Sequence, residues 1–209
     1  MTTVIAFGFM NRSGKDTAAA EIIKQRSQQY DVRRYGFADE MKKEITTAVE
    51  KAGNIVELFA QMDDQLPDWV TLEVEPDMTD PLLPYGKFRS LCQWWGGEYR
   101  RTQNPRYWIE KLEERILEEK PQVALIADMR YSNEMAWVKS TMDGYAVKII
   151  RPDGPTGTGH QSEIELGALP DQAWSYILHN TELERFKATV LSMFDVFVGM
   201  KAGRDISVA

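Results

Sequence analysis

The chain has 209 residues, 43% of them hydrophobic and 27% charged, a composition typical of one globular domain. Its net charge of −7 and pI near 5.0 argue against a long nucleic acid as the main partner, although a local basic pocket for a small phosphate ester is compatible with both. A single cysteine, Cys92, excludes an internal disulfide and favours a reducing, cytoplasmic compartment, and no apolar run approaches a membrane span in length.

The first element is an apolar run, Val4–Phe7, which predicts a strand. A glycine-bearing loop follows it and leads into a helix-forming stretch, Ala18–Arg26. A phosphate-binding loop needs this order of strand, loop and helix. Gly14 would let backbone N–H groups close around phosphate oxygens, and Lys15 would reach the outer phosphates. The start of the helix would direct its partial positive charge at the anion.

The spacing within this loop is informative. Thr17 follows Lys15 after one residue, as in many small-molecule and nucleotide kinases. Gly8 lies six places before Gly14, so Phe9 stands where a glycine is expected. The simpler alternative is a turn whose lysine is only solvated. The agreement of strand, loop and helix favours a site for a nucleoside triphosphate.

The middle of the chain is less regular. Val32–Phe37 predicts a second strand, and Asp39 is placed to cap the helix that follows. Residues 63–87 are acidic and rich in proline, and we expect them to form a solvated insertion at the surface. Phe88–Trp95 has helical spacing, and we expect Gly96-Gly97 to end that helix.

The remainder alternates helices with strands. We expect helices over Pro105–Lys120 and Asn133–Lys139, strands over Val123–Ala127, Ala146–Ile150 and Trp174–Leu178, an irregular loop over 152–162, and a last helix opened by a capping box of Thr181 and Glu184. This alternation predicts a mostly parallel sheet flanked by helices on both faces, an α/β fold of three layers. Ligands of such sheets bind at the carboxyl ends of strands. The residues that follow predicted strands are Gly8, Asp39, Asp128 and Arg151.

Several polar side chains near this edge fit phosphate chemistry. Asp128 directly follows a predicted strand, the position at which a nucleoside triphosphatase places the acid that organises Mg²⁺, often through water. The alternative is that Asp128 only caps the turn that follows. Transfer of a phosphoryl group between anions needs positive charge, and the candidate arginines are Arg100, Arg101, Arg106, Arg130 and Arg151, about half of which we expect to be surface residues only. Helical spacing favours core positions over base stacking for Trp94, Trp95 and Trp108.

Five segments together resemble one family. They are Arg12-Ser-Gly-Lys-Asp-Thr17, Phe37-Ala-Asp-Glu-Met-Lys42, Leu91-Cys-Gln-Trp-Trp-Gly-Gly-Glu98 with Arg101, Asp128-Met-Arg-Tyr-Ser-Asn-Glu134 and His160-Gln-Ser-Glu163. In this order they resemble the deoxynucleoside monophosphate kinases of bacteriophages. The resemblance covers most of the chain apart from roughly 50–87 and the extreme C-terminus. The sequence departs from the family at Phe9 and at Gly97, where a threonine is common.

The resemblance implies transfer of the γ-phosphate of ATP to a deoxynucleoside 5′-monophosphate, with Mg²⁺. It implies one P-loop kinase domain over 1–209, with a helical substrate-binding region at 39–120 and a lid at 151–163 that excludes water. ATP would contact Asn11, Arg12, Ser13, Gly14, Lys15, Asp16 and Thr17, and the metal would contact Thr17 and, through water, Asp128. The monophosphate would contact Asp39, Lys42, Arg89, Gln93, Trp94, Glu98, Arg101 and Arg130. The catalytic residues would be Lys15, Asp16, Arg130 and Arg151.

Other functions remain open at this point. A P-loop kinase for a different small acceptor, of the dephospho-coenzyme A or phosphomevalonate type, has the same loop. A regulatory module could use ATP as a switch without transferring phosphate, although arginines at strand ends favour chemistry. We expect neither nucleic acid nor membrane as a partner and a cytoplasmic location, in the host cell if the chain is phage-encoded. A homodimer is compatible with the acidic 63–87 segment and the tryptophan-rich helix.

Overall fold

A computed structural model describes residues 2–74, 80–86, 88–152, 154 and 165–206. The chain divides into two compact units, which we name by their content. The sheet unit combines Met1–Gly36 with Glu114–Ala209, and the helical unit is Phe37–Glu113. The expected helical region at 39–120 overlaps the second unit, and its role in substrate binding stays a prediction.

Five strands in the described part of the sheet unit form one sheet in the order β2-β3-β1-β4-β5. Their bounds are β1 (Thr3–Gly8), β2 (Val32–Tyr35), β3 (Val123–Met129), β4 (Tyr145–Ile150) and β5 (Tyr176–His179). All four neighbouring pairs are parallel. The prediction of a parallel α/β sheet is therefore confirmed.

The sequence of each strand matches its place in the sheet. Every residue of β1 is buried, as expected for a central parallel strand with both faces covered. The edge strand β2 is different, because Arg33 and Arg34 are exposed between the buried Val32 and Tyr35. The two arginines that interrupt this apolar pattern therefore belong to a sheet edge, where charge discourages further strand pairing.

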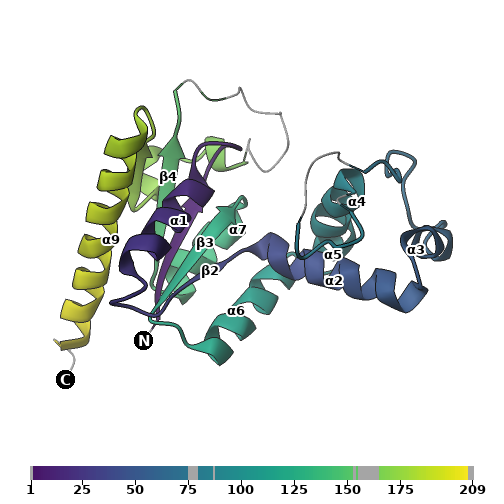
Figure 1. Cartoon of the computed structure of the whole chain (residues 1–209), viewed down its shortest axis with the longest axis horizontal. Coiled ribbons are helices and arrows are strands. Elements are labelled where there is room, and N and C mark those ends of the chain that lie inside the picture. Colours follow the sequence, from purple (N-terminus) through teal and green to yellow (C-terminus); the bar gives the residue numbers. More distant parts are fainter. Residues whose placement is uncertain (1, 75–79, 87, 153, 155–164, 207–209) are drawn as a thin grey trace. The chain divides into compact units, whose positions relative to one another are not determined.

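Helices cover both faces of the sheet (Figure 1). On one face, α1 (Lys15–Arg26) and α9 (Leu183–Ile206) pack against each other and share a core with Ile5 and Phe7 of β1. Alternate residues of a strand point to opposite faces, so Val4 and Ala6 face the other layer. There, α7 (Ser132–Ala136) continues into a π-helical turn, η2 (Trp137–Thr141), which packs on β1 and β4.

The cap of α9 differs from the expected one. The carboxylate of Glu182 accepts the backbone N–H groups of Glu184 at 2.9 Å and Arg185 at 2.8 Å. These bonds favour the charged form and lower the pKa of Glu182. The expected capping box of Thr181 and Glu184 is therefore wrong by one residue: the acid directly before the helix reaches the free N–H groups itself.

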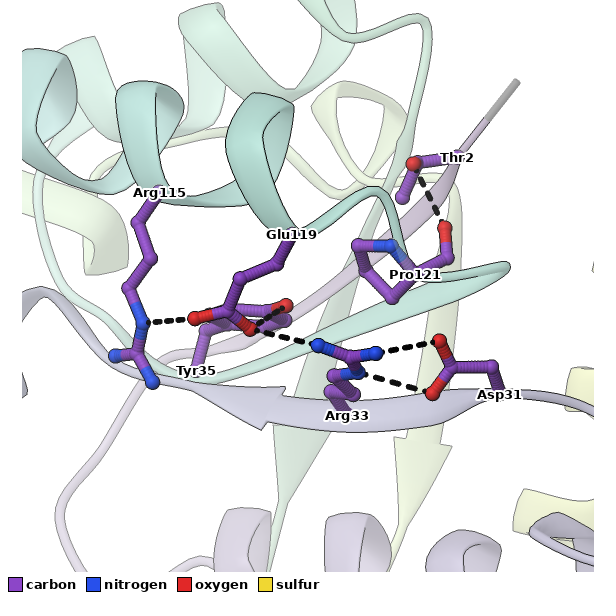
Figure 2. A network of polar contacts seen from close by, with 7 residues as sticks. All are labelled: Thr2, Asp31, Arg33, Tyr35, Arg115, Glu119 and Pro121. Carbon is purple, nitrogen blue, oxygen red and sulfur yellow. Dashed lines mark hydrogen bonds and ion pairs between the residues drawn. The ribbon is translucent and has the colours of Figure 1, made fainter.

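A network of polar contacts joins the end of α6 (Tyr107–Glu119) to the edge strand β2 (Figure 2). The Glu119 carboxylate accepts hydrogen bonds from Arg115 Nε at 2.8 Å, Arg33 Nη1 at 3.2 Å and the Tyr35 hydroxyl at 2.8 Å. The bond from Arg115, with those from Tyr35 and Arg33, lowers the pKa of Glu119 to about 2, although partial burial opposes the shift. Arg33 also binds Asp31, just before β2.

The helical unit contains α2 (Phe37–Ala52), α3 (Ile55–Gln61), α4 (Arg89–Gln93), η1 (Trp94–Tyr99), α5 (Arg100–Gln103) and the start of α6. The buried stripe of α2 begins with Phe37 and recurs at Met41, Ile45 and Val49. Because this stripe starts before Asp39, the helix does too, and Asp39 lies in its first turn instead of capping it. Helix α3 was not predicted from the sequence; Asn54 caps it by accepting the Glu57 N–H at 2.9 Å.

The glycine pair does not end the tryptophan-rich helix, contrary to expectation. Helical structure continues from Arg89 to Gln103, with a π-helical segment, η1, in the middle. A Cβ on Gly96 would lie 2.6 Å from Met41 Sδ, so this glycine allows α2 to approach closely. The Gly96 carbonyl accepts hydrogen bonds from Trp108 Nε1 at 2.9 Å and Arg101 Nε at 3.1 Å. The expected core positions of the tryptophans are confirmed, because Trp94, Trp95 and Trp108 are all buried.

None of the helices in the described residues is long and apolar enough to span a lipid bilayer.

Candidate functional site

The candidate site lies at the carboxyl ends of β1 and β3, which are neighbours in the centre of the sheet. The connection that leaves β1 runs past β3 to reach β2, whereas the connection that leaves β3 runs past β1 in the opposite direction to reach β4. Ligands of open α/β sheets bind where connections diverge in this way. The glycine-bearing loop that follows β1 and the turn that follows β3 are both at this point.

The loop at residues 9–14 is tightly turned. Phe9, Arg12 and Gly14 have φ angles of 90°, 56° and 111°, all in the left-handed region that residues other than glycine rarely adopt. Phe9, the departure from the usual glycine pattern, is held by its side chain. The Nζ atom of Lys148 lies 4.8 Å from the centre of its ring, and Lys148 also pairs with Asp171 at 2.8 Å.

Lys15 is the first residue of α1, and its side chain folds back over the loop. It is buried, and its Nζ atom donates to the Met10 carbonyl at 2.5 Å and to Ser13 Oγ at 3.5 Å. The sequence places the positive charge of Lys15 directly after the loop at residues 9–14. The structure holds that charge against the backbone that surrounds it.

The amino end of α1 is open to an anion. Gly14 is the N-cap residue and has no side chain to satisfy the first N–H groups of the helix. Those groups and the helix dipole together favour negative charge at this end. Thr17 is half-buried in the first turn, whereas the side chain of Asp16 is 81% exposed and pairs with Arg34 Nη2 at 3.1 Å. Asn11 and Arg12, in the loop before α1, are exposed.

Asp128 lies in an irregularity of the sheet. Ala6 is opposite Ile126 and Gly8 is opposite Met129, so two residues of β3 stand opposite the single Phe7 of β1. Such a bulge changes the direction of a side chain, and bulges are common beside active sites. The half-buried Asp128 is one of those two residues.

Two carboxylates that the sequence analysis did not assign hold the turn after β3. Glu134 is 1% exposed and accepts the backbone N–H groups of Arg130 at 2.7 Å and Tyr131 at 3.1 Å. Glu165 accepts both the backbone N–H of Ser132, at 3.0 Å, and its hydroxyl. The exposed Arg130 therefore extends from a backbone that is fixed on both sides.

Asn180 is a further residue of the site that was not predicted from the sequence. It follows β5, and its Nδ2 donates to the Ser13 carbonyl of the loop at 2.9 Å. Asp128 and Arg151 were selected as polar residues directly after predicted strands, but the strand predicted over Trp174–Leu178 ends one residue before β5 does, so that rule did not select Asn180. Arg151 itself is exposed after β4. Of the lid expected at 151–163, residues 153 and 155–163 lie outside the described residues.

The residues expected to bind the monophosphate are in the helical unit, apart from Arg130. Asp39 is buried, and Lys42 Nζ lies 3.9 Å from Asp39 Oδ1 and 2.9 Å from Asp80 Oδ2. Trp94 is buried and stacked on Tyr99, with ring centres 4.8 Å apart. Arg101 binds the Gly96 carbonyl. The exposed residues of this set are Arg89, Gln93 and Glu98.

Glu44 organises the same unit and was not expected. Its carboxylate accepts hydrogen bonds from Trp95 Nε1 at 2.9 Å, Arg100 Nε at 2.5 Å and the Tyr107 hydroxyl at 2.7 Å. Burial, followed by the bond to Glu44, raises the pKa of Tyr107. Arg100, one of the five candidate arginines, thus has a structural partner in the helical unit.

The described residues contain no group of three or more His, Cys, Asp and Glu side chains that could hold a metal ion. Mg²⁺ commonly takes only one or two ligands from the protein and the rest from substrate phosphates and water. A hydroxyl and a carboxylate, as Thr17 and Asp128 would supply, are suitable hard oxygen donors. Their metal role stays a prediction.

Comparison with known proteins identifies a distant relative. The chain matches no protein-family model. It is 25% identical over 206 residues to a protein of Acanthamoeba polyphaga mimivirus that bears the provisional name deoxynucleotide monophosphate kinase. The aligned region covers 88% of this chain and 91% of the relative. The relationship is distant but extends over most of both proteins.

Proposed function

We propose that the protein transfers the γ-phosphate of ATP to a deoxynucleoside 5′-monophosphate, with Mg²⁺, in the cytoplasm. The observation that carries the proposal is the buried Lys15 folded over its own loop, at the uncapped amino end of α1. The name of the mimivirus relative supports the choice of acceptor. The five sequence segments support the same choice independently.

The residues of the sheet unit fit the binding of the phosphate donor. Backbone N–H groups of the loop and of α1 would bind phosphate oxygens, and Lys15 would neutralise the outer phosphates. Thr17 and, through water, Asp128 would hold Mg²⁺, which bridges phosphate oxygens and balances their charge. Asn11, Arg12, Ser13 and Asp16 would complete this side.

The transfer itself makes one bond and breaks one. An oxygen of the acceptor monophosphate bonds to the γ-phosphorus, while the bond from that phosphorus to the terminal ADP oxygen breaks. Negative charge accumulates on the oxygens in the transition state of this step. An arginine placed to stabilise that charge increases the rate of transfer by a factor on the order of 10³ to 10⁵. We assign this role to Arg130 and Arg151. The acceptor would bind through Asp39, Lys42, Arg89, Gln93, Trp94, Glu98 and Arg101.

A coupled assay of ADP release tests the proposal. The assay supplies Mg-ATP with each common deoxy- or ribonucleoside monophosphate in turn. We expect turnover with one or more deoxynucleotides, and a loss of at least about 100-fold in Lys15→Ala because a charge-stabilising donor is removed. Lys24→Ala is the matched control, since Lys24 is exposed in the last turn of the same helix. It should retain full activity.

The outcomes separate the alternatives. Binding of ATP without turnover on any monophosphate would contradict the proposal and favour a kinase for another acceptor or an ATP-dependent regulatory module. Equal activity of Lys15→Ala and the wild type would rule out the phosphate loop as the donor site.

A further inference from the structure

Asn180 connects the edge of the sheet to the candidate phosphate loop. Its backbone N–H donates to the Ile150 carbonyl at 2.8 Å, which extends the pairing of β4 and β5 beyond β5. Its side-chain Nδ2 donates to the Ser13 carbonyl at 2.9 Å. The carboxamide is thus fixed at its base by the sheet and at its tip by the loop.

The bond to Ser13 also orients the next residue. In a trans peptide the carbonyl of one residue and the N–H of the following one point in opposite directions. While Asn180 holds the Ser13 carbonyl, the Gly14 N–H must point away from Asn180. Without this bond the Ser13–Gly14 peptide could rotate and present a carbonyl oxygen where an N–H is needed, which would repel a phosphate.

Gly14 provides an independent sign of this contact. A Cβ on Gly14 would lie 2.6 Å from Asn180 Nδ2 and 3.4 Å from Phe186 Cε1. The φ of 111° also favours glycine at this position. The loop therefore has a glycine beside the Asn180 carboxamide. The Cβ of any other residue at position 14 would displace that carboxamide.

From these contacts we infer that Asn180 is a positioning residue, which keeps the Gly14 N–H directed at the phosphates of the bound nucleotide. The inference rests on the proposed function, because it assumes that the loop binds ATP. Asn180 acts through the loop backbone and takes no part in the reaction itself. Its loss should weaken the binding of phosphate groups whatever base the nucleotide carries.

Isothermal titration calorimetry on the full chain tests this, with Mg-ATP and with inorganic tripolyphosphate as ligands. Because Asn180→Ala loses one orienting hydrogen bond, its affinity for each of the two ligands should be about tenfold lower than that of the wild type. Asn180→Asp keeps the shape but sets a carboxylate against the Ser13 carbonyl, so we expect a larger loss. Ser175→Ala is the matched control: Ser175 Oγ accepts the Ala146 N–H at 3.1 Å at the other end of the same strand pair. It should bind as the wild type does.

A spectroscopic signature distinguishes positioning from simple stabilisation. In the wild type, the amide proton resonance of Gly14 should shift downfield on adding tripolyphosphate, as a hydrogen bond to phosphate forms. That shift should be lost in Asn180→Asp. A Gly14 amide of the wild type that does not respond to bound tripolyphosphate would overturn the inference, even if both Asn180 variants failed to fold.

The remaining outcomes are equally distinct. A wild-type protein that binds neither ligand would refute the proposed function itself. Wild-type binding with unchanged affinity in Asn180→Ala or Asn180→Asp would refute only the role of Asn180. If Ser175→Ala lost as much affinity as the Asn180 variants, the effect would come from the pairing of β4 with β5, and the positioning role of Asn180 would also be refuted.

Discussion

At the scale of single residues, Phe9 combines an unfavourable backbone with favourable side-chain contacts. Its φ of 90° is unfavourable for any residue with a Cβ, while its ring lies beneath the ammonium of Lys148. Phe9→Ala and Phe9→Gly both remove the ring, but only glycine adopts this φ freely. We expect Phe9→Gly to be the more stable of the two, by roughly 1 kcal/mol in the free energy of unfolding in urea.

The order of the two variants is the informative result, because alanine is normally the more stable residue. Phe59, half-buried within α3, is the matched control. There, the alanine variant should exceed the glycine variant in stability. An alanine variant at Phe9 that is as stable as the glycine variant would mean that the loop does not hold the left-handed conformation.

The residues that were predictable from sequence are those whose signal is local. Gly14, Lys15 and Thr17 lie within four positions of one another, so their spacing alone indicates a phosphate loop. Asn180 is separated from Ser13 by 167 positions, and only the folded sheet brings the two together. Glu44 is likewise 51 positions from Trp95. Contacts of this kind leave no pattern in a single sequence.

At the scale of elements, Glu119 fastens the end of α6 to β2 through three hydrogen bonds (Figure 2). The folded-state pKa of about 2 is below the ordinary value of 4.5, so the charged form is the one the fold stabilises. This stabilisation is complete above the ordinary pKa and is lost as the pH falls through the folded-state value. Glu119→Gln should therefore cost about 1–2 kcal/mol at neutral pH, less than the full shift because water screens a partly exposed group.

Urea unfolding from neutral pH down toward the folded-state pKa measures this effect. The wild type and Glu119→Gln should converge in stability as the acid becomes protonated. Glu118→Gln, at the exposed neighbouring position on α6, should follow the wild type throughout. A difference between the wild type and Glu119→Gln that stays constant with pH would show that the charge of Glu119 contributes nothing.

Element positions were predictable where one rule dominates. The buried strands β1, β3 and β4 follow from continuous apolar runs, and α1 follows from its place after the loop. The glycine pair in η1 does not end the helix as predicted, because Gly96 allows the close approach of Met41, a contact across 55 positions that helix propensity does not describe. The helix continues because packing outweighs the modest cost of glycine.

At the scale of the whole molecule, the division into two units gives a prediction about ligands. If the sheet unit binds the donor and the helical unit the acceptor, each ligand should protect a different part of the chain from hydrogen exchange. Mg-ATP alone should slow exchange in residues 8–17 and 128–134. A deoxynucleoside monophosphate alone should slow exchange in residues 88–101. Mass spectrometry of peptides from the exchanged protein measures both.

Residues 195–206, in the second half of α9, provide the internal reference, because neither ligand is expected to contact them. Protection of residues 88–101 by ATP alone, with none in residues 8–17, would reverse the assignment of the two units. Equal protection of every peptide by either ligand would mean that binding stabilises the fold in general and would argue against a division of roles.

The layered architecture was predictable, but the order of the strands was not. Alternating apolar runs and helices indicate a parallel sheet, whatever the arrangement of its strands. The placement of β1 between β3 and β4 depends on pairings across more than a hundred positions. Those pairings decide where the connections diverge, and hence where the site lies.

The same strand order has a consequence for folding during synthesis. β1 is buried on every residue, yet its two neighbours begin only at Val123 and Tyr145. At ribosomal rates of about 5–20 residues per second, β1 leaves the ribosome on the order of ten seconds before either neighbour exists. Throughout that interval the nascent chain carries an apolar strand with two unpaired edges, a target for chaperones and a risk for aggregation. The strand at the centre of the finished sheet is thus made first and waits longest for a partner.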